Sequence, residues 1–257
     1  MDGDVRRVGE LLREWRQRRR TSQLDLAIQA DVSARYVSLV ETGRSNPSAD
    51  MVLRLASALD VPLRHRNRLL LAAGFAPRYR ERPLDAQDMA AAREALVTVL
   101  RAHEPYPALV VDRRWNIMMT NAAVTPFLEG VDPELLRPPL NLVRLALDPR
   151  GFAARIANPA DVRAVFRARL ARQLAEDGDP EIAALYDTYL APAADEPSGP
   201  RDGSDVTISM TVRYRGHDLR LFSTVTTFGT PQDITLQELA VEAYYPADAE
   251  SARLLRG

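Results

Sequence analysis

The stretch "ADVSARYVSLVETGRSNPS", residues 30–48, has the pattern of a short helix whose first turns face outward. Ser33 is of the type that caps a helix N-terminus, and Gly43 is of the type that follows a helix C-terminus. Arg35 and Ser38 fall on the leading turns between them. A helix that only fills a core needs neither an arginine fork nor hydroxyl groups there. The pattern therefore favours a helix that enters a groove of DNA.

Apolar spacing around this stretch predicts further short helices between residues 5 and 75. From Gln23 to Thr42 the apolar positions fit two helices that share one buried face and are joined by a tight turn at Asp31. These positions are Leu26, Ala30, Val32, Val37 and Val40. We thus expect a five-helix bundle as a first domain in residues 1–75.

This bundle, together with the "ETGRSNPS" segment, resembles the helix-turn-helix of phage-repressor-like regulators, the XRE family, over residues 5–73. The resemblance implies that the first turns of the second helix of the pair lie in the major groove. It also implies a salt bridge between Glu41 and Arg16. The family usually has glycine where this chain has Asp31. Aspartate tolerates a left-handed backbone well, so we expect the turn to be kept.

Arg35 is the residue expected to read bases, because its guanidinium can grip guanine O6 and N7. The resemblance assigns Gln23 to a phosphate contact, and two polar residues just beyond the helix are also expected to meet phosphate. Tyr36 fits either packing or a phosphate contact. Leu39 fits either partial burial or the base contact that some family members make. The residues expected at the DNA interface are Gln23, Ser33, Ala34, Arg35, Tyr36, Ser38, Leu39, Thr42, Arg44 and Asn46.

Charge is distributed unevenly along the 257 residues. Residues 1–83 carry 16 arginines and 10 acidic residues, a net charge of +6. The rest carries 18 arginines and 25 acidic residues, a net charge of −7. Every basic residue is arginine, so each cationic contact can be planar and bidentate. A basic first part and an acidic second part indicate two units, the first of which faces a polyanion.

The chain has no cysteine, and its apolar runs are shorter than the roughly 18–20 residues that a membrane-spanning helix needs. The first residues mix acidic and basic side chains and lack a signal-peptide core. We therefore expect a cytoplasmic protein with no membrane partner.

Residues 76–104 have the pattern of a linker and a connecting helix, and residues 105–257 that of a second domain with strands and helices. "YPALVVDRRWNIMMTNAA" (106–123) predicts strand, turn and strand, and helices are expected over 122–190. After a polar insert over 191–205, "VTISMTVRYRGHDLRLFSTVTTF" (206–228) predicts a hairpin. A last strand is expected in "LQELAVEAYYP" (236–246), with Glu238 and Glu242 on the face opposite its apolar residues.

Four segments, "LRHRNRLLLAAGFAP", "YPALVVDRRW", "PLNLVRLALDP" and "LAVEAYYPAD", occur in this order after the bundle begins. Together they resemble the MmyB-like transcription regulators, in which a helix-turn-helix is fused to a PAS-like ligand-binding domain. The resemblance implies an α+β fold of two domains: a five-helix repressor-like bundle, then a PAS-like antiparallel sheet with covering helices. It also implies an apolar pocket for a small hydrophobic, fatty-acid-like effector.

Aromatic and other apolar residues of the second domain are the candidates to line this pocket, and each of them also fits an ordinary core position. Thr120 stands where the family has a large aromatic residue, which would enlarge the pocket. Arg144 and Arg155 are alternatives for an arginine that pairs with a ligand carboxylate at the mouth. The residues expected at the ligand site are Trp115, Met118, Thr120, Phe127, Arg144, Leu145, Phe152, Arg155, Phe166, Phe222 and Phe228.

No catalytic constellation is present in the sequence. His65, His103 and His217 are widely separated and lack metal-ligand spacing. A glycine-rich phosphate loop and a nucleophile elbow are both missing. We therefore expect no enzyme activity, no metal and no cofactor other than a bound hydrophobic effector.

These patterns predict a transcriptional repressor that binds a palindromic double-stranded operator as a homodimer and responds to a small hydrophobic ligand. Two alternatives remain at this stage. In the first, the second domain only dimerises or recruits a partner protein. In the second, more distant alternative, an enzyme carries a regulatory DNA-binding head.

Overall fold

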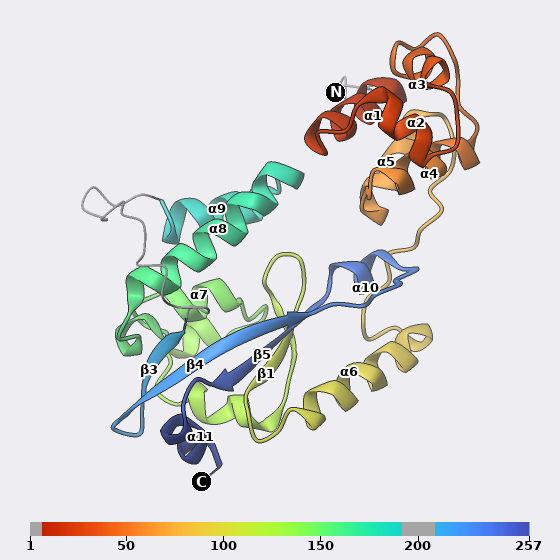
Figure 1. The fold of residues 1–257 in the computed structure, drawn as a ribbon. Coiled ribbons are helices and arrows are strands. Elements are labelled where there is room, and N and C mark those ends of the chain that lie inside the picture. Colours follow the sequence, from red (N-terminus) through yellow and green to blue (C-terminus); the bar gives the residue numbers. More distant parts are fainter. Residues whose placement is uncertain (1–6, 192–208, 257) are drawn as a thin grey trace. The chain divides into compact units, whose positions relative to one another are not determined.

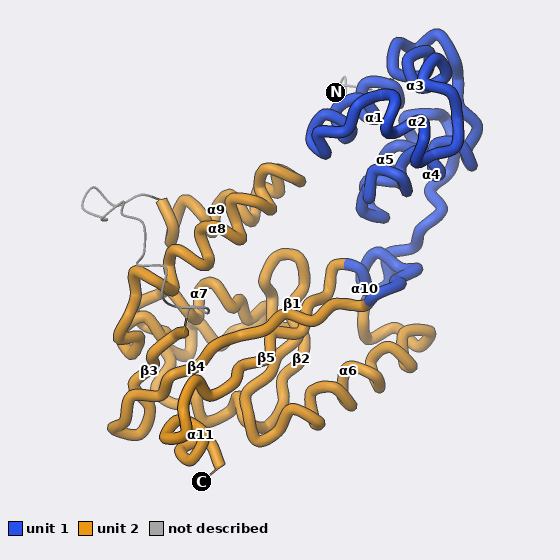
Figure 2. The backbone as a smooth tube through the Cα atoms, in the orientation of Figure 1, with its two compact units in different colours: residues 1–83, 229–237 blue, residues 84–228, 238–257 orange. Residues whose placement is uncertain are grey.

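The computed structural model describes residues 7–191 and 209–256, which form two compact units (Figure 2). The first unit comprises Met1–Pro83 and Gly229–Gln237, and the second comprises Leu84–Phe228 and Glu238–Gly257. These units differ from the expected division at residues 75 and 105. Residues 76–83 pack with the bundle, residues 84–104 pack with the sheet, and a short segment from late in the chain joins the first unit.

The described part of the first unit contains the five expected helices (Figure 1). They are α1 (Val8–Arg18), α2 (Gln23–Gln29), α3 (Ala34–Glu41), α4 (Ala49–Ala58) and α5 (Leu63–Ala72). Serine side chains at positions 22, 33 and 48 accept hydrogen bonds from backbone N–H groups of the first turns of α2, α3 and α4. Leu12, Leu26, Val37, Leu55 and Leu69 lie in one shared core.

The turn between α2 and α3 has the left-handed geometry that was expected of it. Asp31 has a φ of 49°, and the N–H of Val32 donates to the Ala27 carbonyl at 2.9 Å. An aspartate in place of glycine therefore keeps the turn. Its carboxylate also pairs with Arg54 at 2.9 Å on the surface.

Helix α3 is held against α1 and α2 by a close approach and a buried ion pair. A Cβ atom on Gly9 would lie 2.2 Å from the Val40 carbonyl oxygen, so only glycine permits this approach. The Arg16 guanidinium donates to both oxygens of Glu41, at 2.6 and 2.9 Å, which confirms the expected salt bridge. Gln23 donates to the same carboxylate at 2.8 Å. Burial acts to raise the pKa of Glu41, but the bonds from Arg16 and Gln23 hold it below its ordinary value.

The described part of the second unit contains an antiparallel sheet of five strands in the order β2-β1-β5-β4-β3 (Figure 1). The strands are β1 (Ala108–Val111), β2 (Ile117–Thr120), β3 (Met210–Tyr214), β4 (His217–Thr226) and β5 (Ala240–Pro246). The two predicted hairpins are present as β1–β2 and β3–β4. The expected strand residues 206–208 and most of the expected polar insert lie outside the described residues.

Helices cover both faces of this sheet. On one face lie α6 (Ala90–Ala102) and α11 (Ala249–Arg256), and on the other lie α7 (Leu142–Leu147) and α8 (Pro159–Asp177), with α9 (Pro180–Tyr189) packed behind them (Figure 1). The described residues of this unit also form short 3₁₀ helices at Gln87–Met89 (η1), Ala122–Leu128 (η2), Pro133–Leu136 (η3) and Ala153–Arg155 (η4). The helix expected after Asn121 is thus a 3₁₀ helix.

The last strand differs from its expected pattern because both of its faces are covered. Glu242, predicted on a polar face, is only 1% exposed and faces α8. Glu238 precedes the strand and ends the short helix α10 (Ile234–Glu238). Alternation of acidic and apolar residues therefore indicated a solvent-facing side that the fold does not have.

The Arg16–Glu41 pair yields the first testable prediction. Arg16→Met leaves Glu41 buried without its cation, and we expect it to lower the free energy of unfolding of the first unit by about 3–5 kcal/mol. Urea unfolding followed by Trp15 fluorescence in a Trp115→Phe background measures this loss. The matched control is Arg54→Met, which removes an exposed pair and should cost no more than about 1 kcal/mol.

The same pair sets a pH dependence. Because the pKa of Glu41 is lowered on folding, its stabilising contribution is present above the ordinary glutamate pKa and is lost as the pH falls through the lowered value. The stability gap between the natural chain and Glu41→Gln should therefore shrink in acid. A loss in Arg16→Met no larger than that of the control would contradict the assignment.

Candidate DNA-binding surface and ligand pocket

The outer side of α3 presents polar side chains that the fold leaves exposed. Ser33, Arg35 and Thr42 are exposed, as are Arg44 and Asn46 in the segment that follows. The Arg35 guanidinium makes no hydrogen bond or ion pair with any described residue of the protein. Arg35 can therefore contact a duplex without first breaking an internal bond.

The other residues expected at the DNA interface are half-buried. Ala34 and Tyr36 pack against the core of the bundle, so packing is the observed role of Tyr36. The Leu39 carbonyl accepts the N–H groups of Arg44 and Ser45, which closes the helix, and its side chain is partly covered. Ser38 is also partly covered.

Gln23 stands apart from the other expected contacts, because its amide nitrogen already donates to Glu41. The resemblance had assigned it to phosphate. The structure shows it supporting the carboxylate that positions α3, and a phosphate contact would need the remaining N–H of the same group.

A partly open pocket lies between the sheet and the helices of one face in the second unit, with about 690 Å³ of empty space that includes open solvent. Its walls are almost entirely apolar and come from β1, β2, β3, β4 and β5 together with η2, α7 and α8. Four residues expected from the sequence line it: Phe127, Leu145, Phe152 and Phe166. Further apolar side chains complete it, among them Leu109, Ile117, Val124, Leu142, Met210 and Leu221.

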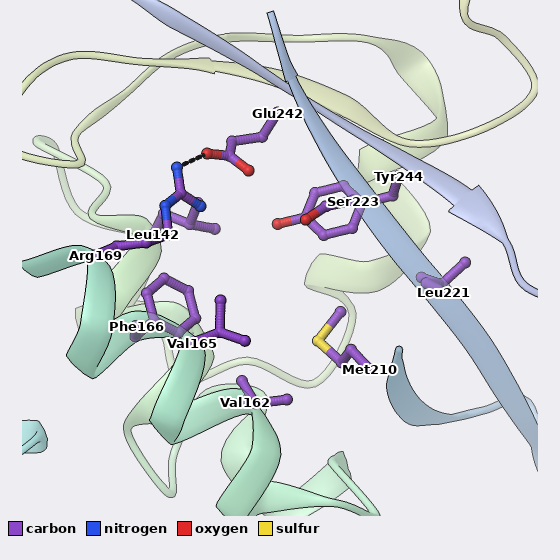
Figure 3. A pocket seen from close by; sticks show the side chains of 10 residues that line it. All are labelled: Leu142, Val162, Val165, Phe166, Arg169, Met210, Leu221, Ser223, Glu242 and Tyr244. Carbon is purple, nitrogen blue, oxygen red and sulfur yellow. Dashed lines mark hydrogen bonds and ion pairs between the residues drawn. The ribbon is translucent and has the colours of Figure 1, made fainter. Parts of the chain in front are cut away.

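A second space, with about 490 Å³ of empty volume that includes open solvent, adjoins the first and has a partly polar lining (Figure 3). The two share Leu142, Phe166, Met210, Leu221 and Tyr244. Arg169, Ser223 and Glu242 line only the second space, and Arg169 donates a hydrogen bond to Glu242. The site as a whole has an apolar part and a polar end.

Four of the expected ligand residues lie away from the pocket, three because strand alternation turns them to the other face of the sheet and one because it lies beyond the strand. Met118 and Thr120 are exposed on β2, on the face opposite to Ile117. Phe222 stacks on Tyr245 with ring centroids 5.3 Å apart, on the face opposite to Leu221. Phe228 lies in the connection beyond the end of β4.

Trp115 and the two candidate arginines also lie outside the pocket lining. Trp115 is buried behind Phe166, and its indole N–H donates to Gln173 at 3.0 Å. Arg144 is exposed on α7. Arg155 donates to the carbonyls of Phe127 and Glu129 and therefore ties the wall of the pocket together, while burial lowers its pKa. Neither arginine stands where a ligand carboxylate would meet it in the pocket.

Arg169 is the arginine that lines the second space, and it was not among the residues expected from the sequence. A signal was present, because Arg169 follows Phe166 by three positions and Val162 by seven, on the same face of α8. The apolar spacing predicts that the hydrophobic residues of this helix share a buried face, but it does not predict that an arginine on the same face lines the site.

No group of three or more histidine, aspartate or glutamate residues in the described part of the chain is placed to hold a metal ion. Within the same residues, the helices are too short or too polar to cross a membrane.

Comparison with known proteins agrees with this arrangement. Residues 92–257 match the MmyB-like transcription regulator ligand binding domain, and residues 7–69 match a helix-turn-helix domain. Among solved structures, the restriction-modification controller protein C.AhdI from Aeromonas hydrophila is 36% identical over 26% of this chain and 96% of its own, with a TM-score of 0.23. The chain matches no curated protein.

These matches confirm both expected resemblances and the two-domain α+β fold, and both domains are those of regulators, not of an enzyme. The chain belongs to the MmyB-like transcription regulators and joins a DNA-binding helix-turn-helix domain to a ligand-binding domain.

Proposed function

We propose that this regulator is a cytoplasmic repressor whose affinity for its operator is controlled by a small hydrophobic effector with a fatty-acid-like chain. The observation that carries the proposal is one of connectivity. Strands β4 and β5 both line the pocket, and the segment that joins them, Gly229–Gln237, belongs to the DNA-binding unit.

The lining of the pocket supports the proposed effector. Its walls are almost entirely apolar, as in most sites that bind small organic ligands. Burial of each methylene group of an alkyl chain stabilises the complex by about 0.8 kcal/mol. An elongated hydrocarbon therefore suits the apolar part.

The joining segment is bound tightly within the first unit. The N–H of Leu63 donates to the Gln237 side chain at 2.6 Å, and the N–H of Ile234 donates to the Arg80 carbonyl at 2.8 Å. The Thr235 hydroxyl donates to the carbonyl of Arg82, whose guanidinium pairs with Asp233. A ligand that displaces β4 or β5 thus pulls on residues of the DNA-binding unit. It alters DNA binding only if it favours one arrangement over another.

A homodimer follows from the way such helices read DNA. Two copies of α3 spaced by one helical turn would contact two half-sites of a palindrome. Pairing of the half-sites multiplies the modest affinity that one short helix supplies.

Arginine substitutions test the DNA contacts. Arg35→Ala should relax the sequence preference at one base position and cost about 1–3 kcal/mol on the preferred operator. Arg44→Ala should weaken binding on every sequence and reduce the salt slope by about one unit. Selection of bound sequences and titration at several salt concentrations measure the two effects. An unchanged preference in Arg35→Ala would remove this residue from the base contacts.

Ligand binding is tested by thermal unfolding of the full chain with straight-chain fatty acids, alcohols and amides of graded length. We expect a saturable rise in the unfolding midpoint and a change in operator affinity. Ala146→Phe, which fills the pocket, should abolish both effects. Ala171→Phe, on the exposed side of α8, is the matched control and should keep them.

The outcome also decides between two functions. If no compound in the series shifts the midpoint while operator binding stays intact, the second unit acts as a dimerisation or protein-interaction module. In that case Ala146→Phe should bind the operator as the natural chain does.

A further inference from the structure

The polar end of the pocket contains a complete ion pair. Arg169 from α8 donates to the Glu242 carboxylate from β5, and the Glu242 side chain is only 1% exposed. The Arg169 guanidinium also lies over the Trp115 ring, 4.3 Å from its centroid. Both charged groups are therefore held in place before any ligand enters (Figure 3).

This pairing leaves the polar end electrically neutral. Arg169 and Glu242 are the charged residues of its lining, and each neutralises the other. A ligand carboxylate could use Arg169 only by drawing it away from Glu242. Removing one partner from a buried ion pair leaves the other charge buried without compensation, and this cost offsets the gain from the new contact.

Two hydroxyl groups complete the polar end. Ser223 and Tyr244 are directly opposite each other on β4 and β5, and neither hydroxyl bonds to a described residue. Figure 3 shows both hydroxyls pointing into the space that the second oxygen of Glu242 also faces. Burial and the nearby Glu242 carboxylate raise the pKa of Tyr244, so its phenol keeps its proton. This end of the pocket thus offers hydrogen-bond donors and acceptors together.

We infer that the effector is an amphiphile whose uncharged head both donates and accepts hydrogen bonds, such as an alcohol or a primary amide, and not a carboxylate. The head donates to the free oxygen of Glu242 and accepts from Ser223 or Tyr244. Its chain lies among Phe127, Phe152 and the other apolar residues of the first space. This inference rests on the proposed function, which places a hydrophobic effector in the pocket.

The test compares three probes with the same alkyl chain: decanol, decanamide and decanoate. Each is titrated into the purified full chain at neutral pH, below its aggregation concentration, and binding is followed by calorimetry. We expect decanol and decanamide to bind about tenfold more tightly than decanoate, or better, because only the carboxylate must compete with Glu242.

Glu242→Gln sharpens the test because it keeps the shape of the side chain and frees Arg169. We expect this variant to bind decanoate about tenfold more tightly than the natural chain does, whereas decanol, which loses a charged acceptor at this position, should show no such gain. Glu134→Gln removes an exposed acid from the same unit and should leave all three affinities unchanged.

Two results overturn the inference while leaving the proposed function in place. One is decanoate binding as tightly as the uncharged probes, and the other is no gain for decanoate in Glu242→Gln. If Glu242→Gln fails to fold, the ranking of the three probes on the natural chain decides alone. If none of the three binds, the hydrophobic effector itself is contradicted, and the inference with it.

Discussion

The buried Glu41 carboxylate fixes the direction in which α3 faces, and the DNA-binding surface depends on it. Arg16 from α1 and Gln23 from α2 both donate to this one group at the end of α3. A buried carboxylate is stable only when such partners are in place, so the three helices are held in one arrangement. Gly9 adds a steric condition, since any larger residue would push α1 away from α3. With these contacts inside, Arg35 and Thr42 are left on the outside.

The second unit also contains a buried ion pair, which lies at the ligand pocket. Helices cover both faces of its sheet. On one face an apolar space remains between helices and sheet, and the Arg169–Glu242 pair lies at its edge. Because the connection between β4 and β5 contributes Gly229–Gln237 to the first unit, the two functions share a covalent path. A ligand that changes the packing of these strands acts on a segment already bonded to Leu63, Arg80 and Arg82. Coupling of this kind needs only differential affinity for two arrangements.

Local signals in the sequence predicted the first unit well and the pocket only in part. Caps, apolar spacing and the turn at Asp31 are determined by neighbours in the chain, so the helices could be expected. The Arg16–Glu41 pair was expected from the resemblance to the XRE family. Phe127 and Phe166 were found because large apolar residues gather inside. Met118, Phe222 and Glu242 were misplaced because alternation along a strand does not say which face is covered, and here both are. The position of Gly229–Gln237 depends on contacts far apart in the chain, which no local pattern records.

Directed cleavage of operator DNA tests most directly whether α3 lies in the major groove. The chain has no cysteine, so Thr42→Cys offers a single attachment point for an iron chelate at the exposed end of this helix. An equivalent label on Ser57→Cys, exposed on α4, is the reference. The account predicts strand cuts from the Thr42 label at the edges of the major groove of each half-site, with few or none from Ser57. Equal cutting from both labels, or cuts from Ser57 alone, would contradict it.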